Sequence, residues 1–207
     1  MHKYSALLLS ALILTSMAGC SVQPLQPNST NWDQHQLQLQ QLEYWQLMGK
    51  MGYQQSGDGG SAWIDWQQQG ASFDVRLSGP FGAGTTHIHS DPEITQLQQA
   101  GKQPVFATTA AELTQQLFGW QWPMEQLRYW VRGVPAPHSP TENQVFNEAG
   151  LLDKLEQAGW QLQFSRYQST EGWILPGKIR GKLLADNGDT SFTLVIKSWR
   201  PNAGLTP

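Results

Sequence analysis

Apolar residues recur at every second position in one segment of this chain after another. Because successive side chains of a strand point to opposite faces, this spacing predicts strands with one buried face. Two-residue alternation marks the segments Trp45–Tyr53, Ala62–Trp66, Phe73–Leu77, Trp160–Phe164, Ile179–Leu183 and Phe192–Ile196, and shorter strands are expected at Thr85–Ser90, Ile94–Gln99 and Gln103–Ala107. The sequence therefore predicts a large antiparallel sheet in one domain, a mainly β chain with helices (α+β).

Three segments carry helix signals instead. Asn31 is placed to cap a helix that runs to about Leu42, and Thr109 to Glu112 has the spacing of a capping box. Pro123 suits a first helical position, and that helix is expected to stop at Gly133. The segment from Leu151 to Ala158 is ambiguous, because its local propensity favours a helix although strands flank it.

The N-terminus has the features of an export signal. The apolar run from Ala6 to Leu14 is shorter than the ~20 residues that span a bilayer. It leads to Met17-Ala18-Gly19-Cys20, which resembles a lipobox with Met17 in the usual place of leucine. We expect residues 1–19 to be a signal peptide, Cys20 to carry N-acyl and S-diacylglycerol lipid, residues 20–30 to form a tether, and residues 31–207 to form one domain. The alternative is an ordinary signal peptide with a chance cysteine.

Composition narrows the function further. Cys20 is the single cysteine, so neither an internal disulfide nor a catalytic thiol is available. The net charge of −3 argues against a nucleic-acid partner and against electrostatic docking to anionic lipid. No G-x-S-x-G motif is present, and the sequence predicts a protein that is not an enzyme.

Two other motifs are candidate sites. Gly79 to Thr86 has the glycine spacing of a phosphate loop, but Thr85 stands where that loop needs lysine. His87 and His89 share one face of a strand, which is a spacing that zinc accepts, but two ligands do not close a site. We therefore expect no metal and no cofactor, with polar decoration of the strand as the plainer interpretation.

The Gly79–Gly84 segment presents one bulky apolar residue between two strands. Flanking glycines and Pro80 place Phe81 on a tight platform, with Gly82 beside it. Either Phe81 folds back into the core, which is worth about 1.5–3 kcal/mol, or it dips into a membrane or a lipid ligand.

The chain resembles the LolB family of outer-membrane lipoprotein receptors in the lipoprotein-sorting pathway. The matching residues are Trp32 with His35, Gly49-Lys50-Met51-Gly52-Tyr53, Trp66, Gly79-Pro80-Phe81-Gly82, Leu127 to Pro137, Gln157-Ala158-Gly159-Trp160, Leu175-Pro176 and Trp199. The Tyr-Trp-Val-Arg-Gly and Gly-Trp segments are fairly specific in this order.

The resemblance implies an incomplete antiparallel β-barrel whose helices cover a hydrophobic cavity, similar to the periplasmic carrier LolA. It also implies a strand at Leu151–Ala158, a membrane-insertion role for Pro80, Phe81 and Gly82, and a monomer that receives acylated lipoproteins from LolA. Ser21 after the lipidated cysteine implies sorting to the outer membrane. We expect Trp66, Trp130 and Trp160 to line or cover the cavity, with ordinary core tryptophans as the alternative. The rival functions are a structural or assembly lipoprotein that binds only protein partners, and a hydrolase that uses His87 or His89.

Overall fold

The computed structural model describes residues 31–79, 84–118, 122–185 and 189–204. The expectations on the signal peptide, on Cys20 and the tether, and on Phe81 with its neighbours Pro80 and Gly82 therefore lie outside the described residues, as does most of the turn expected at Asp186–Asp189. The helices and strands are α1 (Trp32–Gln40), β1 (Tyr44–Gln55), β2 (Asp58–Gln69), β3 (Ser72–Ser78), β4 (Thr86–Ser90), β5 (Thr95–Gln99), β6 (Val105–Ala107), α2 (Ala110–Phe118), α3 (Met124–Trp130), β7 (Thr141–Phe146), β8 (Leu152–Gln157), β9 (Trp160–Ser165), β10 (Gln168–Thr170), β11 (Trp173–Leu175), β12 (Lys178–Leu183) and β13 (Ser191–Pro201).

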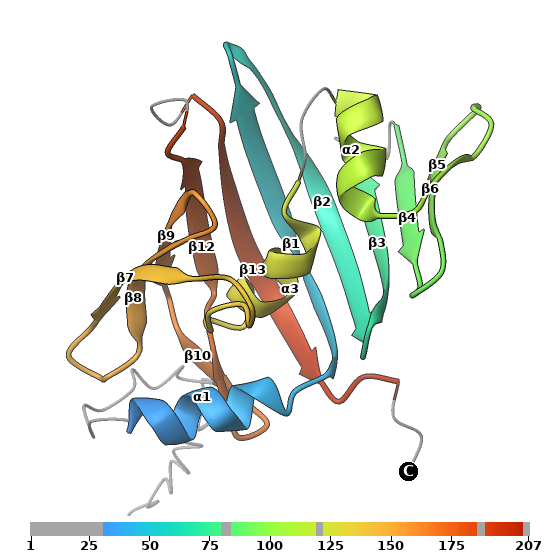
Figure 1. Cartoon of the computed structure of the whole chain (residues 1–207). Coiled ribbons are helices and arrows are strands. Elements are labelled where there is room, and N and C mark those ends of the chain that lie inside the picture. Colours follow the sequence, from blue (N-terminus) through green and yellow to red (C-terminus); the bar gives the residue numbers. More distant parts are fainter. Residues whose placement is uncertain (1–30, 80–83, 119–121, 186–188, 205–207) are drawn as a thin grey trace, which may run out of the picture.

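One curved antiparallel sheet dominates the chain (Figure 1). Its eleven strands follow the order β6-β5-β4-β3-β2-β1-β13-β12-β9-β8-β7, and β10 with β11 forms a separate hairpin. Strands β6 and β7 end the order on opposite sides, so the sheet does not close on itself. This arrangement confirms the expected incomplete β-barrel with helices.

The alternation in the sequence is visible as alternating burial. In β9 every second side chain is buried, beginning with Trp160, and β13 follows the same pattern from Phe192 to Ile196. The buried faces of these strands meet the helices, and together they form one apolar core. The strands predicted from two-residue periodicity are therefore confirmed.

The three helices begin close to where the sequence signals put them. Asn31 caps α1 by accepting a hydrogen bond from the backbone nitrogen of Asp33 at 3.1 Å. The Thr109 hydroxyl oxygen accepts one from the backbone nitrogen of Glu112 at 3.1 Å, at the start of α2. Helices α2 and α3 lie over the same face of the sheet, and α1 lies at its lower end (Figure 1).

The segment with the ambiguous pattern is a strand. Leu152–Gln157 forms β8, as the family resemblance implied and against the local helix propensity. Leu155 and Gln157 are fully buried on the inner face, so tertiary burial outweighs a propensity difference of a few tenths of a kcal/mol per residue. Strand β7 was not predicted, because Thr141–Phe146 is largely exposed and shows no apolar alternation.

Candidate functional site: an apolar cavity

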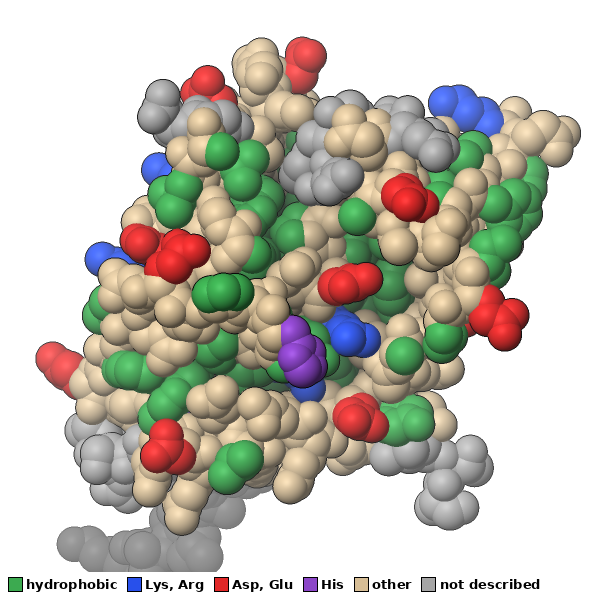
Figure 2. Space-filling view, in the orientation of Figure 1, with side chains coloured by type: hydrophobic (Ala, Val, Ile, Leu, Met, Phe, Trp, Pro, Cys, Tyr) green, Lys and Arg blue, Asp and Glu red, His purple; other side chains and the backbone are tan. Residues whose placement is uncertain are grey.

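A cavity of about 270 Å³ lies between the inner face of the sheet and the two central helices. Its lining comprises Met51, Tyr53, Gly60, Ser61, Ala62, Ile64, Trp66, Val75, Leu77, Gly79, Gly84, Thr86, Ile88, Thr114, Trp122, Met124, Leu127, Phe192 and Leu194. Apolar side chains are visible in a depression on the face that carries the helices (Figure 2). The volume is close to the lower limit of ligand pockets, which is ~300 Å³.

The chemistry of this cavity is almost uniformly apolar. Among the described lining residues no side chain is charged, and the few hydroxyl groups belong to Tyr53, Ser61, Thr86 and Thr114. Such a surface gains free energy by covering hydrocarbon, at about 25 cal/mol per Å² removed from water. It offers no ionic group to bind a charged ligand.

Strand pairing explains why the lining is apolar. Trp66 on β2 lies opposite Val75 on β3, and Val75 lies opposite Ile88 on β4. Paired residues of adjacent strands share a face of the sheet, so one row of apolar side chains crosses three strands. The same periodicity that predicts the strands therefore builds the cavity wall.

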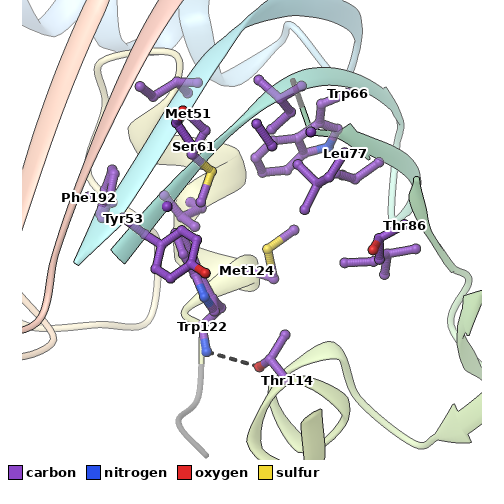
Figure 3. Close-up of a pocket in the computed structure, with 18 of the residues that line it drawn as sticks. Met51, Tyr53, Ser61, Trp66, Leu77, Thr86, Thr114, Trp122, Met124 and Phe192 are labelled. Atoms are coloured by element: carbon purple, nitrogen blue, oxygen red, sulfur yellow. Dashed lines mark hydrogen bonds between the residues drawn. The ribbon is translucent and has the colours of Figure 1, made fainter. Parts of the chain in front are cut away.

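The helices supply the opposite wall. The backbone nitrogen of Trp122 donates a 3.0 Å hydrogen bond to the hydroxyl oxygen of Thr114, which ties the segment before α3 to α2 (Figure 3). Met124 at the start of α3 and Met51 on β1 both present thioether side chains to the cavity. Methionine is flexible and polarisable, so these two residues can adapt to ligands of different shape.

Phe192 owes its place in the cavity to a glycine opposite it. Gly181 on β12 pairs with Phe192 on β13, and a Cβ atom at Gly181 would overlap the Phe192 ring. The ring lies over this glycine, 5.7 Å from the Trp122 ring and 5.5 Å from the Trp160 ring, measured between centroids. Aromatic contacts thus fix one side of the cavity.

The three tryptophans assigned to the cavity occupy different places. Trp66 belongs to the lining. Trp160 lies behind Phe192, and Trp130 is fully buried in α3, where its indole contacts Gln157. The structure thus brings Trp66 to the cavity and puts the other two in the packed core around it, while a role in ligand binding stays a prediction for all three.

The residues that flank the loop assigned to membrane insertion line the cavity. Gly79 and Gly84 both belong to the lining, and residues 80–83 between them lie outside the described residues. Strands β3 and β4, which this loop joins, are neighbours in the sheet.

The two histidines lie away from the cavity. Thr86 and Ile88 line the cavity from β4, so the intervening His87 and the following His89 belong to the opposite face. His87 Nε2 and His89 Nδ1 lie 2.7 and 3.3 Å from Asp74 Oδ1. Within the described residues no group of three or more histidine, cysteine or acidic side chains is placed to hold a metal ion.

Sequence reasoning did not single out Met51, Leu77, Met124 or Phe192 as site residues. Each is an apolar residue in a strand or helix pattern, and such a pattern predicts burial without separating a packed core from a cavity wall. Only the curvature of the sheet and the positions of α2 and α3 make that distinction.

Solved structures with the same architecture share very little sequence with the chain. A LolA superfamily protein from Nitrosomonas europaea superposes with a TM-score of 0.54 at 9% identity, covering 84% of this chain and 94% of that one. A putative outer membrane lipoprotein-sorting protein domain from Vibrio parahaemolyticus gives 0.51 at 8% identity, covering 84% and 92%. Fold and cavity together define a LolA-like half-barrel protein with an internal apolar site.

Sequence comparison narrows this class to one family. The family described as "Outer membrane lipoprotein LolB" matches residues 43–199, and the chain belongs to this family. An outer-membrane lipoprotein LolB from Cellvibrio japonicus is 35% identical over 193 residues, covering 93% of this chain and 95% of that protein. The LolB of Stutzerimonas stutzeri is 35% identical over 202 residues, covering 94% and 95%.

No helix among the residues described is both long and apolar enough to cross a membrane.

Proposed function

We propose that this protein receives acylated lipoproteins from the periplasmic carrier LolA and inserts them into the inner leaflet of the outer membrane. The observation that carries the proposal is the apolar cavity of about 270 Å³, whose described lining holds no charge and includes Gly79 and Gly84. Membership of the LolB family supports the same function.

The energetics of the cargo explain why a cavity is needed. Burying an acyl chain is worth about 0.8 kcal/mol per methylene, so the two or three long chains of a lipoprotein amount to tens of kcal/mol. Free diffusion of such cargo through water is therefore negligible. The chains must pass from one apolar cavity to another.

The proposal includes a lipid anchor on Cys20. Stable anchoring needs at least two acyl chains, which N-acyl and S-diacylglycerol modification supplies. The names of the relatives, outer-membrane lipoproteins, support the outer membrane as the place of the anchor. The anchor holds the cavity at the surface of the bilayer that receives the cargo.

Transfer from the carrier is expected to run down an affinity gradient. The sequence shows no phosphate loop with its lysine, since Thr85 occupies that position. Each tenfold difference in affinity between the carrier and this protein supplies about 1.4 kcal/mol. Transfer therefore requires that this cavity bind the acyl chains more tightly than the carrier does.

A transfer assay tests the proposal. A radiolabelled lipoprotein bound to purified LolA is mixed with a Cys20→Ala variant, which keeps the domain without the anchor. We expect the label to move to the variant in solution and to reach liposomes only when the anchored protein is supplied. Retention of all label on the carrier would refute the proposed function.

The rival function, a lipoprotein that binds only protein partners, requires no internal space. Its half-barrel would be filled by side chains. The apolar cavity therefore favours the transfer function over this alternative.

A further inference from the structure

A second pocket of about 280 Å³ lies at the other end of the first β-hairpin. The apolar cavity extends to Tyr53 and Gly60, which flank the β1–β2 turn, whereas the second pocket includes Trp45 and Gly70 at the opposite end of those strands. The described linings share no residue. The Trp45 and Trp66 rings contact each other in a tilted arrangement with centroids 5.2 Å apart, so two indoles separate the pockets.

Two residues that line this second pocket each carry a buried donor without an acceptor. Trp45 is fully buried, and its indole nitrogen has no hydrogen-bond partner in the described part of the chain. The Nε atom of Arg128 is likewise buried and unpaired there. Leaving a buried donor unpaired costs about 1–3 kcal/mol, and more for a charged group.

A second guanidinium is fixed beside the first. Arg132 Nη1 donates to the backbone oxygens of Leu39 and Leu42 at 2.8 and 2.7 Å, and its Nε donates to the Arg128 oxygen at 3.0 Å. These bonds remove the rotamer freedom that usually makes arginine binding costly. The position of this cation is therefore set before any ligand arrives.

Both guanidiniums contact the ring of Tyr129, and neither forms an ion pair with a carboxylate in the described part of the chain. The guanidinium carbons of Arg128 and Arg132 each lie 4.9 Å from the centre of the Tyr129 ring. Within the described ranges, the ion pairs closer than 4.0 Å involve Asp74 with the two histidines and neither of these arginines. Burial lowers the pKa of Arg132 to about 10, with Tyr129 and Glu43 opposing this and Arg128 lowering it further, so the Arg132 guanidinium stays charged at neutral pH.

We propose that this second pocket binds an oxyanion of the phosphate class. Arginine guanidiniums match phosphate geometry, and a phosphate beside Arg128 and Arg132 would offset the repulsion between the two cations. Glu43 is the one acidic residue in the described lining, so the two arginines leave the pocket net positive. The site is independent of acyl-chain binding in the other cavity.

The phosphate group has two possible sources, a free phosphate ion and the phosphodiester of a lipid head group. Isothermal titration of the full-length protein in detergent with inorganic phosphate tests the first source. Titration with glycerophosphoglycerol, the deacylated head group of phosphatidylglycerol, tests the second. The tighter ligand identifies the source, and both titrations are run at constant ionic strength against chloride.

Two variants link binding to the pocket. Arg128→Gln removes one guanidinium from the lining, and Trp45→Phe keeps an aromatic ring against Trp66 and serves to assign the Trp45 indole resonance. Arg128→Gln is expected to weaken phosphate binding at least about tenfold. Arg180→Gln, which removes an exposed cation on β12, is expected to leave it unchanged.

A spectroscopic readout covers the case in which a variant unfolds. In protein labelled with ¹⁵N-tryptophan, phosphate should shift the indole N–H resonance that disappears in Trp45→Phe. The absence of heat with both ligands, or equal weakening in Arg180→Gln and Arg128→Gln, would overturn the proposal. So would an unchanged Trp45 resonance at saturating phosphate.

Discussion

The indole nitrogen of Trp130 donates a 2.8 Å hydrogen bond to the side-chain oxygen of Gln157, and both side chains are fully buried. This contact joins helix α3 to strand β8 across 27 residues of sequence. The same amide accepts from the Ala136 nitrogen at 2.8 Å and donates to the oxygens of Ala136 and Ser139. One glutamine therefore fixes both α3 and the loop that follows it, and α3 in turn forms a wall of the cavity.

Replacing Gln157 tests this connection. Gln157→Leu keeps the volume but leaves the Trp130 nitrogen and two polar groups of Ala136 without partners. We expect the free energy of unfolding to fall by about 3 kcal/mol in urea titration. Gln161→Leu, which removes an exposed bond to Glu156, serves as the control and is expected to cost less than about 0.5 kcal/mol. Equal losses in the two variants would contradict the role of Gln157.

A charge in the cavity should abolish acyl-chain binding. Leu77 lines the cavity and is half-buried, so Leu77→Glu can fold with its carboxylate partly hydrated. An acyl chain that covers this carboxylate must desolvate it, and we expect the affinity for a fluorescent fatty acid to fall at least tenfold, about 1.4 kcal/mol or more. Arg76→Glu places the same side chain on the exposed face of β3 and is expected to bind normally. Unchanged affinity in Leu77→Glu would exclude this cavity as the binding site.

The three tryptophans should respond differently to truncation. Trp66→Ala enlarges the cavity and is expected to change acyl-chain affinity in protein that remains folded. Trp130→Ala removes a fully buried indole from the core and is expected to cost about 3–5 kcal/mol of stability. Fatty-acid titration and urea denaturation of each variant separate the two effects. If folded Trp66→Ala, Trp130→Ala and Trp160→Ala all keep the affinity of the unsubstituted protein, a binding role for the three tryptophans is rejected.

The loop that carries Phe81 is predicted to act at the release step. Phe81→Glu should leave transfer from the carrier intact but block delivery to liposomes, because a carboxylate resists entry into the bilayer. Phe81→Leu keeps an apolar side chain and is expected to deliver normally. Liposome flotation after transfer measures both variants. Normal delivery by Phe81→Glu would refute the insertion role.

The sequence predicted the strands whose inner and outer faces differ in polarity. Trp160, Leu162 and Phe164 alternate with glutamines, and β9 is where that pattern places it. The alternation of apolar and polar residues did not predict β7, because the residues of this strand are largely exposed and show no such alternation. It left β8 ambiguous, because good helix formers such as Leu155 and Gln157 are held in a strand by contacts with residues distant in sequence.

The apolar cavity was harder to predict from the sequence than the fold was. A tryptophan in an alternating strand is predicted to be buried, and the sequence predicted that for Trp66 and Trp160 alike. Whether its ring meets another side chain or an empty space depends on the curvature of the sheet, and Phe192 covers Trp160 whereas Trp66 faces the cavity. Curvature arises from many strand pairs together, so no local motif encodes it.

The most direct test of the central claim is photo-cross-linking of a cargo lipoprotein that carries a diazirine on its acyl chain. After transfer and irradiation, mass spectrometry locates the cross-linked peptides. We predict cross-links at Met51, Leu77 and Met124 on the cavity wall, and their loss in Leu77→Glu. Cross-links confined to the outer face of the sheet, for example at the exposed Trp63, would contradict the account.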